Sequence, residues 1–168
     1  MTRATSVLPA GTWDAASAVG TVTLPVAERH RRRIRLPVDD GGDVLLDLPD
    51  AVMLVDGDGL ALEGGGVLRV VAAAEEVADI TCTDPLHLAR MAWHLGNRHL
   101  PLQVVDAHTL RISWDHVIAA MVQGLGASVR RRSAPFQPEG GAYSGGGHGH
   151  GHHHHGHDDD DDAHAHDH

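Results

Sequence analysis

The chain has 168 residues and a formal net charge of −10, with 23 acidic residues against 13 basic ones, all of them arginine. Such an acidic balance excludes the broad basic surface typical of nucleic-acid-binding proteins, so we expect no nucleic-acid partner. No apolar run approaches the roughly 20 residues that a membrane span needs. Residues 1–20 also lack the apolar segment of a secretory signal. We therefore expect a soluble, cytoplasmic protein without a membrane partner.

Residues 1–73 are predicted to form a small all-β domain, because short β-rich segments alternate with turn sequences from residue 20 onward. The turn sequences are DDGGD, DGDG and EGGG. The DGDG stretch lacks the distant glutamate of a calcium-binding EF-hand loop, so we interpret it as a turn. The predicted strands are TVTLPV, RIRLPV, DVLLDLP, VMLV and VLRVVAA.

Residues 74–147 show a different pattern, in which strands alternate with two amphipathic helices. The order of predicted elements is β-α-β-β-α-β, which is the ferredoxin-like pattern. The remaining residues, 148–168, are too polar to build a core and are expected to be disordered. The predicted fold class is therefore α+β: a small all-β N-terminal domain, a ferredoxin-like domain and a disordered histidine-rich tail.

The two predicted helices carry recognisable end signals. The first, PLHLARMAWHL, begins after Asp84, a good N-cap, and ends before Gly96 and Asn97, which suit a left-handed C-terminal cap. The second, WDHVIAAMVQGL, is predicted to be capped by Ser113 and to end at Gly126. Both helices show an apolar stripe that would pack on the sheet.

The tail holds ten histidines and six aspartates in residues 148–168, interleaved with glycine and alanine. Neutral imidazole is a good ligand for nickel, copper and zinc, and carboxylates can assist it. The longest histidine run is four, and its interruption favours a natural metal-binding tail over an expression tag. The candidate ligands are His148, His150, His152, His153, His154, His155, His157, His164, His166 and His168.

His99 is the candidate ligand outside the tail. It lies just past a predicted helix end and two residues before Pro101, which stiffens the backbone there. One imidazole is not a metal site, and a lone loop histidine is more often simply solvated. A symmetric dimer changes this, because one exposed histidine near the twofold axis becomes two ligands.

His116, in the first turn of the second predicted helix, is a further candidate ligand. The helix dipole disfavours the imidazolium form there and leaves the ring free for a metal. A plain role in the capping turn is equally open from the spacing. For His87 and His94, on the first helix, we favour structural roles. The single Cys82 excludes a CxxC zinc site.

The stretches HLGNRHLPLQV, ISWDHVIAAMVQGLG and APFQPEGGAY, together with the histidine-rich tail, resemble the urease accessory protein UreE family of nickel metallochaperones. The resemblance implies a β-rich N-terminal domain similar to a peptide-binding module, and a ferredoxin-like domain through which a homodimer forms. It also implies that His99 meets its twin at the dimer interface and binds Ni²⁺. His116 matches a peripheral ligand of some members, whereas Trp114 stands where some members have another histidine.

The function implied by this resemblance is donation of Ni²⁺ to apo-urease, with Zn²⁺ or Cu²⁺ as competing ions. The implied partners are the urease accessory GTPase and the apo-urease accessory complex. The protein would not be an enzyme, and the sequence shows no nucleophile–base pair or P-loop. Two alternatives stay open: a nickel or zinc store that delivers nothing, and a peptide-binding chaperone that acts through the N-terminal domain.

Overall fold

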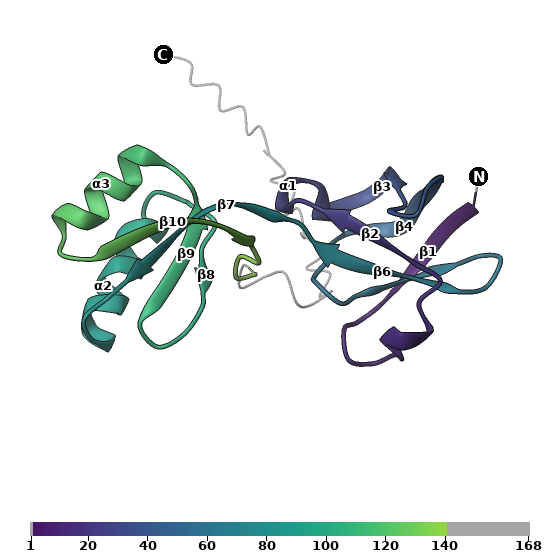
Figure 1. Cartoon of the computed structure of the whole chain (residues 1–168), viewed down its shortest axis with the longest axis horizontal. Helices are drawn as coiled ribbons and strands as arrows, with labels where there is room; N and C mark the ends of the chain where they lie inside the picture. The colour runs from purple at the N-terminus through teal and green to yellow at the C-terminus, as the bar shows by residue number, and fades with distance from the viewer. Residues whose placement is uncertain (1, 141–168) are drawn as a thin grey trace, which may run out of the picture.

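The computed structural model describes residues 2–140, which form two lobes, each built around its own sheet (Figure 1). The predictions for the tail, residues 148–168, lie outside the described residues. The α+β class is confirmed: an all-β lobe comes first, and a lobe with a sheet and two long helices follows. Among the helices of residues 2–140, none is long and apolar enough to cross a membrane.

The N-terminal lobe is a six-stranded sheet with the order β2-β6-β5-β1-β4-β3. Its central position is taken by a strand from the very start of the chain, which pairs parallel to β4 and antiparallel to β5. The elements are β1 (Thr2–Leu8), the 3₁₀ helix η1 (Ala15–Ser17), β2 (Gly20–Leu24), α1 (Val26–Arg29), β3 (His30–Pro37), β4 (Asp43–Met53), β5 (Gly59–Leu62) and β6 (Val67–Ala72).

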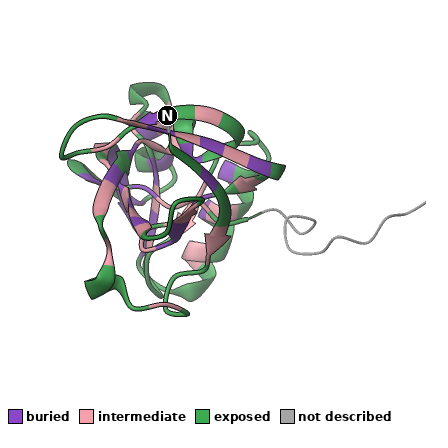
Figure 2. Ribbon diagram, turned by 90° about the vertical axis from the view of Figure 1, so that its right-hand side faces the viewer, coloured by how far each residue is buried: buried purple, intermediate pink, exposed green. Residues whose placement is uncertain are grey.

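Alternating side chains along these strands build the core of the N-terminal lobe. In β4, Val44, Leu46 and Leu48 are buried while the residues between them are partly exposed, because successive side chains of a strand point to opposite faces. Figure 2 shows the same banding of buried and exposed residues along the ribbon. The DGDG stretch is a turn, as predicted: the Asp58 carboxylate accepts the backbone N–H groups of Ala10 and Val55 at 2.9 and 2.8 Å.

The C-terminal lobe is a four-stranded antiparallel sheet with the order β10-β7-β9-β8. Its elements follow one another as β-α-β-β-α-β, the order that the sequence predicts, and the last strand pairs with the first. The elements are β7 (Ala74–Thr81), α2 (Pro85–Gly96), β8 (Gln103–Val104), β9 (Thr109–Ser113), α3 (His116–Gly124) and β10 (Ser128–Pro135).

Both long helices pack on one side of this sheet (Figure 1). The buried cluster between helices and sheet includes Met91 and Leu95 from α2, Val122 from α3, and Ile80 and Ile112 from the central strands. The single cysteine also lies in this cluster and is buried. This packing fixes the positions of α2 and α3 on the sheet. It therefore also fixes the loop that follows α2 and the first turn of α3.

A buried arginine joins the two lobes. The Arg29 side chain, at the end of α1, has no exposed surface and donates to the backbone carbonyls of Leu54 and Phe136 and to the side-chain oxygen of Gln137. Phe136, directly after β10, is buried beside Val77, with Val26 packed against the same cluster. The end of the C-terminal sheet is thus fastened to the N-terminal lobe by the Arg29 guanidinium together with this apolar contact.

Candidate functional site

The chain turns sharply at His99, just after α2. The helix closes with Arg98 N–H donating to the Leu95 carbonyl at 3.1 Å and His99 N–H donating to the Gly96 carbonyl at 2.9 Å. His99 then takes a φ of 55°, and it is the single non-glycine residue between positions 2 and 140 with a positive φ. The predicted left-handed cap at Gly96 or Asn97 is therefore wrong, since Gly96 has no positive φ and Asn97, just after the helix, has a right-handed φ of −63°. The left-handed position falls on His99 instead.

This backbone conformation is costly for a histidine. A left-handed residue that carries a Cβ is disfavoured by about 1–2 kcal/mol, which is why glycine usually takes such positions. Strain of this kind persists where a particular side chain is needed at that point. The His99 side chain is exposed, as is the neighbouring Pro101. The strain therefore supports a function for this imidazole.

His116 is the first residue of α3 and is also exposed. The helix is capped by Asp115, whose carboxylate accepts the N–H groups of Val117 and Ile118 at 2.8 and 3.0 Å. Those hydrogen bonds and the nearby His116 lower the pKa of the Asp115 carboxyl. The prediction that Ser113 caps this helix is wrong, because Ser113 is the last residue of β9 and pairs with β7.

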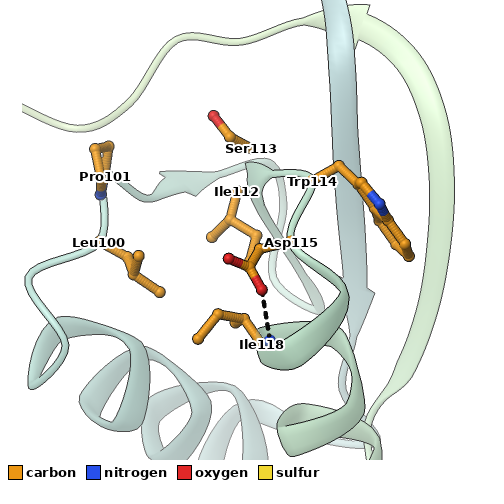
Figure 3. A pocket seen from close by; sticks show the side chains of 7 residues that line it. All are labelled: Leu100, Pro101, Ile112, Ser113, Trp114, Asp115 and Ile118. Atoms are coloured by element: carbon orange, nitrogen blue, oxygen red, sulfur yellow. Dashed lines mark hydrogen bonds between the residues drawn. The ribbon is translucent and has the colours of Figure 1, made fainter.

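A pocket of about 150 Å³ is lined by residues that adjoin each of these two histidines in the sequence (Figure 3). One wall is made by Leu100 and Pro101, which follow His99, and another by Trp114 and Asp115, which precede His116. The floor is apolar and comes from the end of β9 and the first turn of α3. The complete lining is Leu100, Pro101, Ile112, Ser113, Trp114, Asp115 and Ile118. The residues adjoining His99 and His116 thus meet around one hollow.

The pocket was not predicted, and neither was the position of Trp114. The Arg131 guanidinium lies 4.9 Å from the centre of the Trp114 ring and forms an ion pair with Glu76 at 2.6 Å. The Trp114 backbone N–H also donates to the Glu76 carbonyl at 2.9 Å. Contacts with Arg131 on β10 and Glu76 on β7 thus hold Trp114 in place. No periodic pattern in the sequence predicts these contacts.

Two other histidines of this lobe have structural surroundings, as predicted. Thr83 N–H donates to Nδ1 of His87 at 3.2 Å, so Nε2 carries the proton and donates to the Leu125 carbonyl at 3.0 Å. His87 therefore ties the start of α2 to the end of α3 and has no free nitrogen for a metal. His94 is half-buried and stands edge-on to Trp93, with ring centres 5.0 Å apart.

Residues 2–140 contain no group of three or more His, Cys, Asp or Glu side chains placed to hold a metal ion. His99 and His116, whose neighbours in the sequence line the pocket, do not form such a group within these residues. A metal site built on His99 would need ligands from a second copy of the chain or from residues beyond position 140. The tail histidines fall in that outer segment, outside the described residues.

The end of the described chain lies close to the His99 corner. Glu139 N–H donates to the Leu102 carbonyl at 2.7 Å, and the Glu139 side chain accepts the N–H of Val104 at 3.1 Å. Leu102 is three residues from His99. The segment that precedes the histidine-rich tail is therefore fastened to the strand that follows this corner.

Comparison with known proteins identifies the family. The family model for the N-terminal domain of UreE urease accessory proteins matches residues 4–73. The family model for the C-terminal domain of the same proteins matches residues 75–168. The chain is 50% identical over 147 residues to the urease accessory protein UreE of Beijerinckia indica, which covers 88% of this chain and 84% of that protein. The identity to the urease accessory protein UreE of Bradyrhizobium sp. (strain ORS 278) is 54% over 144 residues, 86% of this chain and 68% of that protein.

A third relative, of which the match covers nearly the whole length, belongs to the same family. The urease accessory protein UreE of Rhizobium meliloti is 49% identical over 141 residues, which is 84% of this chain and 90% of that protein. These matches confirm the resemblance found in the sequence and imply a role in urease maturation. The matched family is one of accessory proteins. The chain belongs to the UreE family of urease accessory proteins.

Proposed function

We propose that this protein is a cytoplasmic nickel metallochaperone that carries Ni²⁺ as its cargo and donates it to apo-urease. The observation that supports this most strongly is His99: an exposed imidazole held at a strained, stiff corner, in a chain of a urease accessory family. Imidazole binds nickel well through its unprotonated nitrogen, and an exposed side chain is open to the ion.

The proposed site forms in a homodimer, where His99 of each copy supplies one ligand at the twofold axis. His116, which directly follows Asp115 of the pocket lining, is proposed as a peripheral ligand. A site with so few protein ligands holds nickel in a form that a partner can remove. The proposed role of the tail histidines is to collect nickel, and Zn²⁺ and Cu²⁺ would compete there because such a tract imposes no geometry.

The proposed partners are the urease accessory GTPase and the apo-urease accessory complex. The alternative function is storage, in which the protein buffers nickel or zinc and passes it to no particular partner. The two functions differ in one property. A donor transfers nickel through a protein–protein complex, whereas a store releases nickel into solution.

Transfer in the presence of a chelator separates these functions. We expect the nickel-loaded protein to load the GTPase even when excess chelator captures every ion released into solution. The His99→Asn variant should lose this protected transfer, whereas the matched variant His108→Asn, at another exposed histidine of the same lobe, should keep it. Loading that stops completely once chelator is added would favour storage over donation.

A further inference from the structure

The pocket beside His99 has the size and lining for one aromatic ring. Its volume is about 150 Å³, and its walls are mainly the apolar side chains of Leu100, Ile112 and Ile118 (Figure 3). A cavity of roughly this volume with an apolar lining is large enough to take benzene. Its lining also contains the polar side chains of Ser113 and Asp115. Oδ1 of Asp115 accepts two backbone N–H groups, while Oδ2 bonds to no group within residues 2–140. The pocket thus suits a ring that carries a hydroxyl group.

The path of the chain after β10 leads to this pocket. The Pro135 carbonyl accepts from Arg111 on β9 at 2.8 Å, and four residues later Glu139 is bound to Leu102, directly before β8. The chain therefore crosses the end of the sheet and arrives one residue from Pro101, which is part of the pocket wall. In Figure 3 the coil after β10 runs across the top of the view toward the side where Pro101 lies.

The segment that follows offers one side chain of the right kind. Residues 141–168 consist of glycine, alanine, serine, histidine and aspartate, with Tyr143 as their single aromatic or large apolar side chain other than histidine. Tyr143 lies four residues after Glu139, and four residues of extended chain span at most about 13–14 Å. The intervening Gly140, Gly141 and Ala142 place no bulky side chain in the way.

We propose that the Tyr143 ring occupies this pocket in its own chain, with its hydroxyl group donating to Asp115. Burial of an aromatic ring against Leu100 and Ile118 would supply the driving force, and the hydrogen bond would fix the orientation. The docked ring would anchor the start of the histidine-rich tail between His99 and His116. This anchoring does not depend on a metal. Its use in nickel handling rests on the function proposed above.

The single tyrosine of the chain makes a direct test possible. Incorporation of 3-fluorotyrosine into the full-length protein gives one ¹⁹F signal, which reports on residue 143 alone. We expect this signal, without nickel, to lie away from the position of free fluorotyrosine and to resist broadening by a soluble gadolinium chelate. We also expect both properties to persist on dilution, because Glu139 holds the ring close to the pocket of the same chain.

Variants locate the contact. Leu100→Ala, in the pocket wall, should move the signal toward the free position and restore broadening by gadolinium. Leu86→Ala, at an exposed position of α2 outside the pocket, should leave the signal unchanged. A wild-type signal at the free position with full broadening would overturn the proposal, and so would loss of protection on dilution. The wild-type measurement decides the question even if Leu100→Ala fails to fold, and it leaves the nickel-donor proposal untouched.

Discussion

At His99 the side chain and the backbone have opposite preferences. The left-handed turn after α2 is one that glycine would adopt freely, whereas a histidine there pays a conformational penalty. Asparagine tolerates the left-handed region better than most residues, because its short polar side chain can bond to the nearby backbone. Substitutions at this position can therefore separate two effects: the conformational cost of the left-handed backbone, and the contribution of the imidazole to metal binding.

We predict that His99→Gly and His99→Asn leave the free energy of unfolding of the metal-free protein unchanged or slightly higher. His99→Val should lower it by about 1–2 kcal/mol relative to His99→Asn, because a β-branched side chain is poorly tolerated at positive φ. Urea denaturation of the metal-free proteins measures both. If His99→Val were as stable as His99→Asn, the positive φ would not be a feature of the folded protein in solution.

The imidazole at position 99 was predictable from the sequence as a candidate ligand, but its conformation was not. Gly96 and Asn97 are the residues that usually end a helix in the left-handed region, and the sequence contains both. The helix instead runs through Gly96, and the turn closes on the Gly96 carbonyl through His99 N–H. Which of several adjacent residues takes the left-handed position depends on where Leu100 enters the core, and that is a tertiary contact.

Among the elements, α3 depends on the Asp115 cap at its N-terminus. The pKa of the Asp115 carboxyl is lowered, first by the hydrogen bond from Ile118 N–H and then by Val117 N–H and His116. A carboxyl whose pKa is lower in the folded chain than its unfolded value of about 3.9 stabilises the fold above that pH. This stabilisation is lost as the pH falls through the folded pKa. The sign therefore predicts a weaker cap in acid.

We predict that Asp115→Asn is less stable than the wild type at pH 7. A neutral amide accepts hydrogen bonds more weakly than a carboxylate, and it lacks the negative charge that interacts favourably with the helix dipole. The difference should shrink as the pH falls below about 4, where the wild-type carboxyl becomes protonated. Thermal melts of both proteins between neutral and acidic pH measure the difference. A gap that stays constant over this range would mean that the charge of Asp115 does not contribute to the cap.

Elements with a clear hydrophobic periodicity could be predicted from the sequence. Elements whose place depends on pairing between distant strands could not. Helix α2, its Asp84 cap and the order of elements in the C-terminal lobe follow from sequence periodicity and capping rules. Strand β1 has the sequence TRATSVL, which shows no strand pattern, and lies between β4 and β5 in its sheet. Its central place depends on these two pairings, which the sequence does not reveal. The apolar run before residue 106, LPLQVV, predicts a full strand, yet β8 consists of Gln103 and Val104 alone.

At the scale of the whole molecule, Arg29 provides a fully buried charged contact between the lobes. Burial lowers the pKa of its guanidinium, while Glu75 and Asp56 act in the opposite direction. Its donors satisfy the carbonyls of Leu54 and Phe136, which lie on the two sides of the junction. A buried carbonyl left without a donor costs about 1–3 kcal/mol. Loss of Arg29 should therefore affect the attachment of the lobes as well as stability.

We predict that Arg29→Met lowers the free energy of unfolding by about 2–4 kcal/mol, as two buried carbonyls lose their donor. The matched variant Arg31→Met, at an exposed position of β3, should change it by less than about 0.5 kcal/mol. Small-angle scattering of Arg29→Met should also show a larger radius of gyration, provided that the protein is still folded. Equal stability of the two variants would show that the buried guanidinium contributes nothing to the junction.

The central claim is that His99 is the ligand from which nickel is delivered, and urease activation with limiting nickel tests it most directly. Apo-urease, its accessory proteins and a fixed small amount of nickel are combined with the wild type, His99→Asn or His108→Asn. Substitution of residues that merely support metal ligands typically costs about 10–100-fold in metal affinity or activity. Loss of His99 from both copies of the proposed homodimer should therefore lower activation at least that much. We predict this loss for His99→Asn and wild-type activation for His108→Asn. Normal activation by His99→Asn would contradict the account and assign delivery to other ligands.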